Sequence, residues 1–324
     1  MHHRRKLMLR RRRYSGYSSR YRRRRVSVSA VFRFILIVLL IGVIGYCAVT
    51  VYRAFRSSAY IAELESQNKT LQATVDRYQA ALPDPSIADS IEPMDYQTLY
   101  PEMKVDPKPT PAAAPENTVY LTFDGGPSQN TVTILDALKN AGQKATFFVV
   151  GKNIAGNEAI VKRIVDEGHT IGIRSYSNDY NAIYASPEAF LEDFHQAYQA
   201  VYDACGVYPA VFRFPGGSVS PYNQANYEQL IAEMLRRGFI YYDWSVSAGD
   251  DTSASRTITQ ITQAVLNGLS KKSSSTPVVL LHDGANKTST ATACANLLSE
   301  LSRAGYTCDR LTGSVRPVTF AYNR

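Results

Sequence analysis

The distribution of apolar and polar positions divides the chain into segments of different character. Residues 34–52 read FILIVLLIGVIGYCAVTVY, 19 positions without a charge. A helix of this length is about 28 Å long at 1.5 Å per residue, which is enough to cross the hydrocarbon core of a bilayer. We therefore predict a transmembrane helix over residues 34–52. A cleaved signal peptide is the alternative, but no small-x-small cleavage motif follows the run, and flanking arginines disfavour a buried soluble helix.

The segment before this span is strongly basic. Residues 1–33 contain 13 Lys or Arg and no Asp or Glu. The positive-inside rule places such a tail in the cytoplasm, so we expect a single-pass protein of the cell membrane with its C-terminal part outside. Tyr alternates with Arg in the tail, a composition that suits acidic lipid headgroups or nucleic acid. We favour a topology signal with lipid contact and expect no nucleic-acid partner.

A heptad pattern follows the apolar span. Apolar positions with one Asn recur at alternating spacings of three and four: Ile61, Leu64, Asn68, Leu71, Val75, Tyr78 and Leu82. Such a seam predicts a short coiled-coil stalk over residues 53–82, and a buried Asn at an a position favours parallel pairing. We expect a parallel homodimer through residues 61–82, with a single amphipathic helix on the bilayer or on the domain as the alternative.

Residues 83–118 contain eight prolines and few apolar residues, which predicts a semi-extended linker that holds the next domain away from the membrane. From residue 119 to 324 apolar runs alternate with amphipathic segments. Strands are predicted at 118–123, 145–150, 169–173, 210–214, 239–244 and 277–282, and helices at 130–140, 158–167, 187–205, 227–237, 255–269 and 290–303. Repeated β–α units predict an α/β domain with a parallel sheet, open or closed into a barrel.

Composition changes this picture only slightly. The chain of 324 residues is 45% hydrophobic and 20% charged, which is ordinary for a globular protein. The net charge of +8 belongs to the tail, because the rest holds 23 basic and 28 acidic residues. Cys205, Cys294 and Cys308 form no CxxC motif, and a Cys294–Cys308 disulfide stays open.

Polar residues stand at or just after several predicted strands, where parallel α/β folds carry their chemistry. They are Asp124, Arg174, Arg213, Asp250 and His282. Polar residues are also common where a strand ends and a loop begins, so this pattern identifies no site by itself.

Six sequence blocks in order resemble the polysaccharide deacetylases of the NodB type (carbohydrate esterase family four). They are TFDGGPSQNTVTIL at 122–135, KATFFVVG at 144–151, GHTIGIRSYSNDY at 168–180, FRFPGGS at 212–218, DWSVSAGDD at 243–251 and VVLLHDGA at 278–285. The resemblance covers residues 118–311. It implies a distorted, partly open (β/α) barrel that hydrolyses the acetamide group of an N-acetylated glycan with a divalent metal, usually zinc.

Carried over by motif position, the resemblance makes Asp124 the general base, Arg213 the group that orients it and His282 the acid held by Asp250. Gly216 is implied to donate its backbone N–H to the oxyanion. Trp244 and Leu280 are implied to line the acetyl pocket. The alternatives are a structural ion pair for Asp124 with Arg213, a cap in its loop for Asp250, and ordinary core packing for Trp244 and Leu280.

The three positions that ligate the metal in the family are substituted here. They carry Gly125, Arg174 and Asn178 where the family has Asp, His and His. Glycine has no side chain, a guanidinium has no lone pair for a metal, and a neutral amide oxygen is a weak zinc ligand. Asp179 is the one plausible substitute ligand, while His169 is expected to point elsewhere. We predict no bound metal, very low or absent deacetylase activity, and an ion pair between Arg174 and Asp124.

Three functions remain after these substitutions. The favoured one is a pseudoenzyme that binds N-acetylated cell-wall glycan, of the peptidoglycan type, or a protein partner, without turnover. The second is an active deacetylase of an envelope polysaccharide with an unconventional site, which the retained Asp124, Arg213, Asp250 and His282 favour. The third is an envelope scaffold whose important parts are the stalk and the tail.

Overall fold

The computed structural model describes Lys69 and residues 93–106, 110–251, 256–271 and 276–320. The predicted cytoplasmic tail, transmembrane helix and stalk, apart from Lys69, lie outside the described residues. Within the described part, no helix has the length and apolar character needed to cross a membrane. The following description concerns the compact unit that begins at Glu92.

A curled parallel sheet forms the centre of this unit. Its strands are β1 (Thr118–Asp124), β2 (Thr146–Val150), β3 (Thr170–Ser175), β4 (Val211–Phe212), β5 (Ile240–Tyr241), β6 (Val246–Ser247), β7 (Val278–His282) and β8 (Thr307–Cys308). They are hydrogen-bonded in the order β5-β4-β3-β2-β1-β7-β6, and β8 pairs with β1. Strands β5 and β6 are the two ends of this order, which confirms the predicted parallel, partly open (β/α) architecture.

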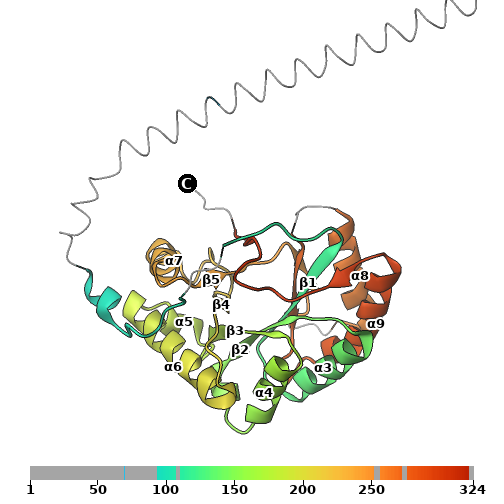
Figure 1. The fold of residues 1–324 in the computed structure, drawn as a ribbon, viewed down its shortest axis with the longest axis horizontal. Helices are drawn as coiled ribbons and strands as arrows, with labels where there is room; N and C mark the ends of the chain where they lie inside the picture. The colour runs from blue at the N-terminus through green and yellow to red at the C-terminus, as the bar shows by residue number, and fades with distance from the viewer. Residues whose placement is uncertain (1–68, 70–92, 107–109, 252–255, 272–275, 321–324) are drawn as a thin grey trace, which may run out of the picture. The chain divides into compact units, whose positions relative to one another are not determined.

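Helices cover the outside of the sheet. They are α3 (Gln129–Ala141), α4 (Glu158–Asp166), α5 (Tyr180–Ile183), α6 (Pro187–Cys205), α7 (Tyr227–Arg236), α8 (Ile258–Ser270) and α9 (Thr288–Arg303), with short 3₁₀ turns η1 (Asp95–Thr98) and η2 (Gly151–Asn153). Figure 1 shows α6, α4, α3, α9 and α8 following one another around the curved sheet. This arrangement leaves the carboxyl ends of the strands uncovered for a site.

Local sequence explains where the longest helix begins and ends. The side chain of Ser186 accepts a hydrogen bond from the backbone N–H of Ala189, and Pro187 occupies the first helical turn of α6. Gly206 ends the helix in the left-handed conformation. These are the N-cap, first-turn and C-terminal residues that helices prefer, and they make the predicted bounds of 187–205 correct.

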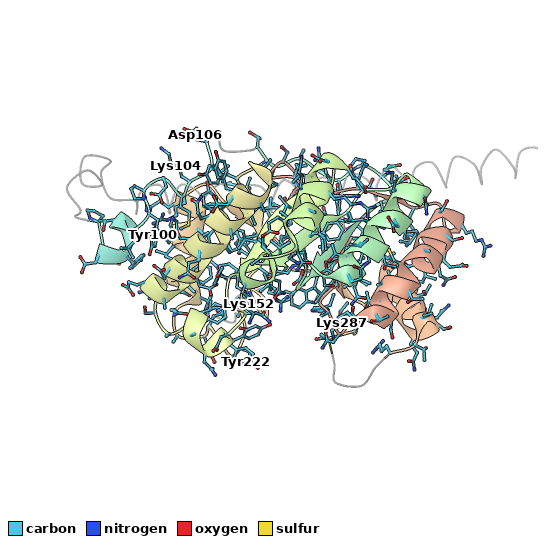
Figure 2. All side chains as sticks on the ribbon, turned by 90° about the horizontal axis from the view of Figure 1, so that it is seen from below. Tyr100, Lys104, Asp106, Lys152, Tyr222 and Lys287 are labelled. Carbon is cyan, nitrogen blue, oxygen red and sulfur yellow. The ribbon has the colours of Figure 1, made fainter. Side chains whose placement is uncertain are left out.

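The middle of the predicted linker, residues 93–106, is packed on the domain. Tyr96 and Met103 are buried in the apolar cluster under α6 and α7. The guanidinium of Arg237 donates hydrogen bonds to the carbonyls of Leu99 and Tyr100, each at 2.7 Å. In Figure 2 Tyr100, Lys104 and Asp106 lie along the same side of the domain. The segment 93–106 is therefore clamped to the domain, so this part of the predicted linker is not a free spacer.

Farther along, Ala112 pairs with Val315 in an isolated parallel bridge, so the segments before β1 and after β8 lie side by side.

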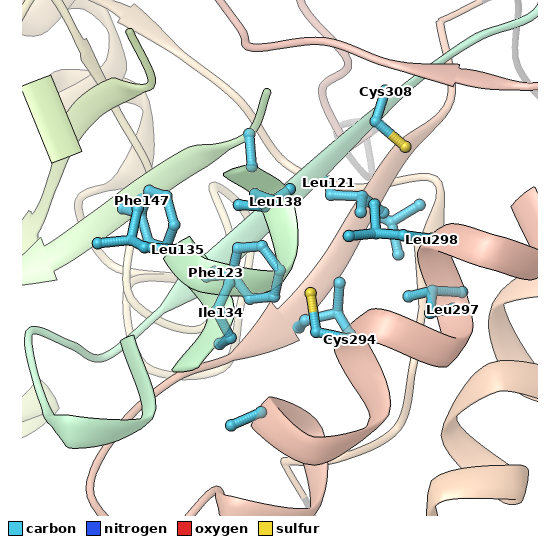
Figure 3. Close-up of a cluster of buried hydrophobic side chains, with 14 of the residues drawn as sticks. Leu121, Phe123, Ile134, Leu135, Leu138, Phe147, Cys294, Leu297, Leu298 and Cys308 are labelled. Carbon is cyan, nitrogen blue, oxygen red and sulfur yellow. The ribbon is translucent and has the colours of Figure 1, made fainter. Parts of the chain in front are cut away.

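The main apolar core lies between the sheet and helices α3, α4, α8 and α9. Figure 3 shows Leu121 and Phe123 of β1 facing Ile134, Leu135 and Leu138 of α3. Cys294 and Cys308 are buried in the same cluster. Both are free, as is Cys205, so the disulfide that the sequence left open is not formed in the structure. Burial raises the pKa of Cys294 and of Cys308 to about 12, so both thiols stay protonated and act as small apolar side chains.

Strand register determines which polar residues meet. Asp124 at the end of β1 lies directly opposite His282 at the end of β7. Ile173 of β3 lies opposite Phe212 of β4, so the residues that follow them, Arg174 and Arg213, reach the same edge of the sheet. The carboxyl edge of the sheet thus receives one carboxylate, one imidazole and two guanidinium groups.

The short elements are where the sequence prediction failed. Strand β6, strand β8, helix α5 and the two 3₁₀ turns were not predicted, and α8 begins at Ile258, three residues after the predicted start. Strands β6 and β8 are two residues long, too short to show an alternating pattern. The side chain of Thr257 accepts from the N–H of Gln260, and this cap sets the start of α8.

His169 gives the domain a pH-dependent stability. Burial, together with the nearby Lys144, lowers its pKa from 6.5 to about 4, and its Nδ1 accepts a hydrogen bond from the N–H of Ala145. Below pH 6.5 the unfolded chain binds a proton that the folded chain does not bind. The free energy of unfolding therefore falls as the pH falls from 6.5 to 4, by up to about 3 kcal/mol from this group.

Replacing His169 tests this account. Asn can present an oxygen near the position of Nδ1 but does not titrate, so His169→Asn lowers stability at pH 7.5 yet flattens its decline between pH 6.5 and 4. Denaturant unfolding at a series of pH values measures both quantities. Parallel declines in the two proteins would show that His169 is not the titrating group.

Candidate functional site

One buried carboxylate lies at the centre of the candidate site. Asp124 is 1% exposed, and its Oδ1 accepts a hydrogen bond from Nη1 of Arg213 at 2.8 Å. Its Oδ2 accepts from Nη1 of Arg174. The ion pair predicted between Arg174 and Asp124 is therefore present, and each carboxylate oxygen is held by a different guanidinium.

Hydrogen bonds and an aromatic ring hold the side chain of Arg213 in place. It is fully buried, and it donates to Oγ1 of Thr122 at 2.7 Å, to the carbonyl of Tyr242 at 2.8 Å and to the carbonyl of Asp243 at 3.1 Å. Its guanidinium carbon also lies 4.4 Å from the centre of the Phe148 ring. Because a buried guanidinium needs a partner for each N–H, this environment fixes the rotamer of Arg213 and, through it, that of Asp124.

Gly172 makes room for this arrangement. A Cβ at position 172 would lie 2.7 Å from Cδ1 of the Phe148 ring and 2.9 Å from the carbonyl oxygen of Val211. No larger residue fits there without moving the ring on which Arg213 rests.

Arg174 reaches Asp124 from β3 and is bound at each of its three nitrogens. Its Nε donates to Oδ1 of Asn178 at 3.1 Å, and its Nη2 donates to the hydroxyl of Tyr180 at 2.7 Å. Burial alone would lower its pKa, but the charge of Asp124 and the hydroxyl of Tyr180 hold that pKa above its ordinary value. Arg174 is therefore a permanent cation at this position.

His282 and Asp250 form a second pair on the other side of the site. The carboxylate of Asp250 contacts Nδ1 of His282 at 2.9 Å and accepts from its backbone N–H at 2.8 Å. Burial alone would raise the pKa of Asp250, but the hydrogen bonds from His282 and Thr290 hold it below its ordinary value. A charged Asp250 places the imidazole proton on Nδ1, which leaves the Nε2 lone pair of His282 for the pocket.

These groups line a pocket of about 370 Å³ at the carboxyl edge of the sheet. Its walls are formed by Asp124, Arg174, Tyr180, Gly216, Trp244, Asp251, Leu280, His282 and Lys287. The structure thus brings together all seven predicted site residues, with Arg213 and Asp250 behind the wall as partners of Asp124 and His282. Among the hydrogen bonds of the described residues, none uses the backbone N–H of Gly216, so this donor is available to a ligand.

Two wall residues were missed from the sequence, Asp251 and Lys287, and a third, Tyr180, was given no contact with Arg174. Tyr180 is the last residue of its sequence block, and Lys287, which donates to the carbonyl of Asp250 at 2.6 Å, follows the final block by two residues. Their distance from the motif positions along the chain gave no signal of their contacts.

Two further buried carboxylates hold the loops around the site together. Asp243 accepts from the backbone N–H groups of Ser218 and Phe320, and Asp283 accepts from the N–H of Gly126 and the hydroxyl of Thr131. Burial raises the pKa of Asp283 to about 6. Each of these residues adjoins a motif residue in sequence, but its role is to tie loops together.

The residues at the family's metal positions do not fit a divalent cation. Gly125 offers no side chain, and its φ of +100° is one that an L-residue rarely adopts. Arg174 and Asn178 are bonded to each other, and Arg174 places a positive charge on Asp124. Throughout the residues whose positions are described, no group of three or more His, Cys, Asp or Glu is arranged to hold a metal ion.

The two alternative ligands are engaged elsewhere. Asp179 caps α5, since its Oδ1 accepts from the backbone N–H groups of Asn181 and Ala182. His169 lies at the start of β3 in the core, away from the pocket wall, as the sequence predicted.

Comparisons with known proteins agree with the fold. The family model described as polysaccharide deacetylase matches residues 112–236. The chain is 29% identical over 233 residues to the Bacillus subtilis protein YheN, covering 72% of this chain and 80% of that protein. It is 33% identical over 207 residues to the peptidoglycan-N-acetylglucosamine deacetylase PgdA of Listeria monocytogenes, which is 63% of this chain but only 40% of PgdA.

A solved structure covers the domain more completely. The catalytic domain of the peptidoglycan N-acetylglucosamine deacetylase from Eubacterium rectale superposes with a TM-score of 0.62 at 32% sequence identity, covering 68% of this chain and 100% of that domain. The chain therefore belongs to the polysaccharide deacetylase family.

The shared carboxylate predicts an order of stabilities. Arg174→Ala leaves Asp124 with Arg213 as its one ion-pair partner, and we expect a loss of about 2 kcal/mol in the free energy of unfolding. Asp124→Ala leaves two buried guanidinium groups without their carboxylate and costs more, about 4 kcal/mol. Thermal unfolding of the variants measures both losses.

Arg303→Ala is the matched control, because Arg303 forms an exposed ion pair with Glu300 on α9 and its loss changes stability by less than about 0.5 kcal/mol. An Arg174→Ala variant as stable as this control would show that the buried pair does not support the fold.

Proposed function

We propose that this protein is a metal-free member of the polysaccharide deacetylase family that binds N-acetylated cell-wall glycan, of the peptidoglycan type, without hydrolysing it. The observation that carries the proposal is the guanidinium of Arg174, which occupies a metal-ligand position and binds the carboxylate of Asp124. The named activity of the relatives, deacetylation of peptidoglycan N-acetylglucosamine, supports the class of ligand.

The pocket has the groups that an acetamide needs. The N–H of Gly216 is available to a carbonyl oxygen. The hydroxyl oxygen of Tyr180 accepts from Arg174 and so keeps its own proton for a second hydrogen bond. Trp244 and Leu280 offer apolar surface to the acetyl methyl group, and Nε2 of His282 accepts from a sugar hydroxyl or an amide N–H. These few polar groups on an apolar wall fix the orientation of a small ligand.

The same contacts disfavour turnover. A general base must accept a proton from water on one of its oxygens, within hydrogen-bond reach. Each oxygen of Asp124 already accepts from a guanidinium, so a water can approach only a lone pair that Arg174 or Arg213 leaves free.

An active deacetylase is the second candidate, because Asp124, Arg213, Asp250 and His282 keep the mutual contacts that the family resemblance implies. In that case the acid, its carboxylate partner and the oriented base are all in place, and the site lacks the ligands for a metal. A measurement of metal content and turnover distinguishes the two.

The setting of this domain is a further part of the proposal. The uncharged run at 34–52 and the Arg-rich residues 1–33 support a single-pass anchor in the cell membrane with a cytoplasmic N-terminus and lipid contact. The heptads at 61–82 support a parallel homodimer.

Metal content is the first test of this function. The purified full-length chain, loaded with zinc and desalted, is expected to retain far less than one zinc per chain and to release no acetate from N-acetylated glycan. Arg174→His/Asn178→His restores two imidazoles at the ligand positions and is expected to raise zinc retention. Near-stoichiometric zinc in the wild-type protein would overturn the metal-free assignment.

Glycan binding is the second test. Sedimentation with N-acetylated peptidoglycan is expected to retain the protein, and chemically de-N-acetylated peptidoglycan is expected to retain it several-fold less, because the acetyl group is what the pocket holds. Equal retention by both polymers, or by neither, contradicts an acetamide-binding pocket.

A further inference from the structure

The turn that carries Gly216 runs between two pairs of aromatic rings, Tyr180 with Tyr222 and Trp244 with Phe320. A Cβ at Gly216 would lie 3.2 Å from Cε2 of Tyr180 and 3.6 Å from Cδ2 of Tyr222. A Cβ at Gly217 would lie 2.5 Å from Cε2 of Phe320. The two glycines therefore allow rings to close on the backbone from both sides of the turn, directly beside the pocket.

The first ring pair extends from the pocket into solvent. Tyr180 forms part of the pocket wall, and Tyr222 packs edge-on against it with ring centres 4.8 Å apart and planes at 87°. Tyr222 is 56% exposed, which leaves a large part of its ring to solvent. A tyrosine has an apolar ring with a polar tip, and such rings provide binding area at a low cost in conformational entropy.

The loop that presents Tyr222 is held firmly. The neighbouring Asn223 is fully buried, and its Nδ2 donates to the carbonyls of Gly217 and Ser218, each at 3.1 Å. Its Oδ1 accepts from the backbone N–H of Ser220 at 2.8 Å. An exposed ring on an anchored loop is preorganised for a partner, because little conformational freedom is lost on binding.

The position of Tyr222 beside the pocket indicates which ligand can contact its ring. In Figure 2 Tyr222 lies at the same edge of the molecule as Lys152 and Lys287, and Lys287 is a pocket wall residue. A ligand that continues out of the pocket past Tyr180 meets Tyr222 next. For a glycan, that continuation is the next sugar unit, whose axial C–H groups form an apolar face that suits an aromatic ring.

We propose that Tyr222 and Tyr180 form a second sugar subsite, which binds the pyranose ring next to the one whose acetamide enters the pocket. This inference rests on the proposed glycan-binding function and adds to it the length of the ligand: the protein recognises at least two linked sugars. The subsite contributes to the affinity for oligosaccharides and leaves that for a single sugar unchanged.

The test compares a short and a long probe on the full-length chain. Calorimetric titration uses N-acetylglucosamine and its β-1,4-linked tetramer with the wild-type protein and Tyr222→Ala. We expect Tyr222→Ala to weaken binding of the tetramer by about tenfold and to leave binding of the single sugar unchanged. Tyr222→Phe, which keeps the ring, retains tetramer binding.

Tyr208→Ala is the matched control. Tyr208 is also an exposed tyrosine, 46% exposed, but it stacks on Tyr198 and Tyr202 of α6 and forms no part of the pocket wall. Its loss is expected to change the affinity for neither probe.

The other outcomes separate this inference from the function on which it rests. Tetramer binding that is equal in wild type and Tyr222→Ala overturns the second subsite and leaves the glycan-binding function in place. An equal loss for both probes also overturns it, because Tyr222 would then act on the pocket itself. A wild-type protein that binds neither probe overturns the glycan-binding function and the subsite together.

Discussion

A single carboxylate shared by two guanidinium groups determines the character of this domain. Asp124 ends β1, Arg174 lies in β3 and Arg213 follows β4, so the cluster ties together strands from the centre and one side of the sheet. A buried charge is tolerated only when it is paired and hydrogen-bonded, and each member of this cluster supplies what the others need. The edge of the sheet that bears the pocket is therefore rigid without any bound ion.

On the proposed metal-free assignment, the cluster also explains how the deacetylase frame persists without metal ligands. In the pattern that the family resemblance implies, a metal supplies the positive charge opposite the carboxylate. Here the chain supplies it, and Asn178 and Tyr180 hold the new cation in position. Gly125 carries no side chain, so the position directly after Asp124 adds no second negative charge. Arg174 and Asn178 act together, because the amide oxygen of Asn178 accepts a hydrogen bond from the guanidinium that binds Asp124.

The sequence predicted the architecture more completely than the site. Long segments with a clear period, such as 187–205, gave helix bounds that the structure reproduces, and ordered motifs named the residues that reach the carboxyl edge. The predicted pair of Arg174 and Asp124 followed from chemistry, because a guanidinium at a metal-ligand position faces the carboxylate of Asp124 and is attracted to it. What the sequence could not show depends on contacts between distant segments. Tyr180 and Lys287 enter the pocket wall through the turn of a four-residue helix and a loop, and neither turn has a period to read. The segment 93–106 has the composition of a linker but is packed on the domain, because its few apolar residues are buried against α6 and α7.

The clamp on that N-terminal segment determines where mechanical load enters the domain. Arg237, itself buried against Glu233 of α7, holds the carbonyls of Leu99 and Tyr100. Tension applied from the N-terminal side of the chain is therefore transmitted first to α7, which lies next to the β5 end of the sheet, and not to the central strand β1. The strand that carries Asp124 is therefore loaded only after the contacts of Arg237 with Leu99 and Tyr100 have broken.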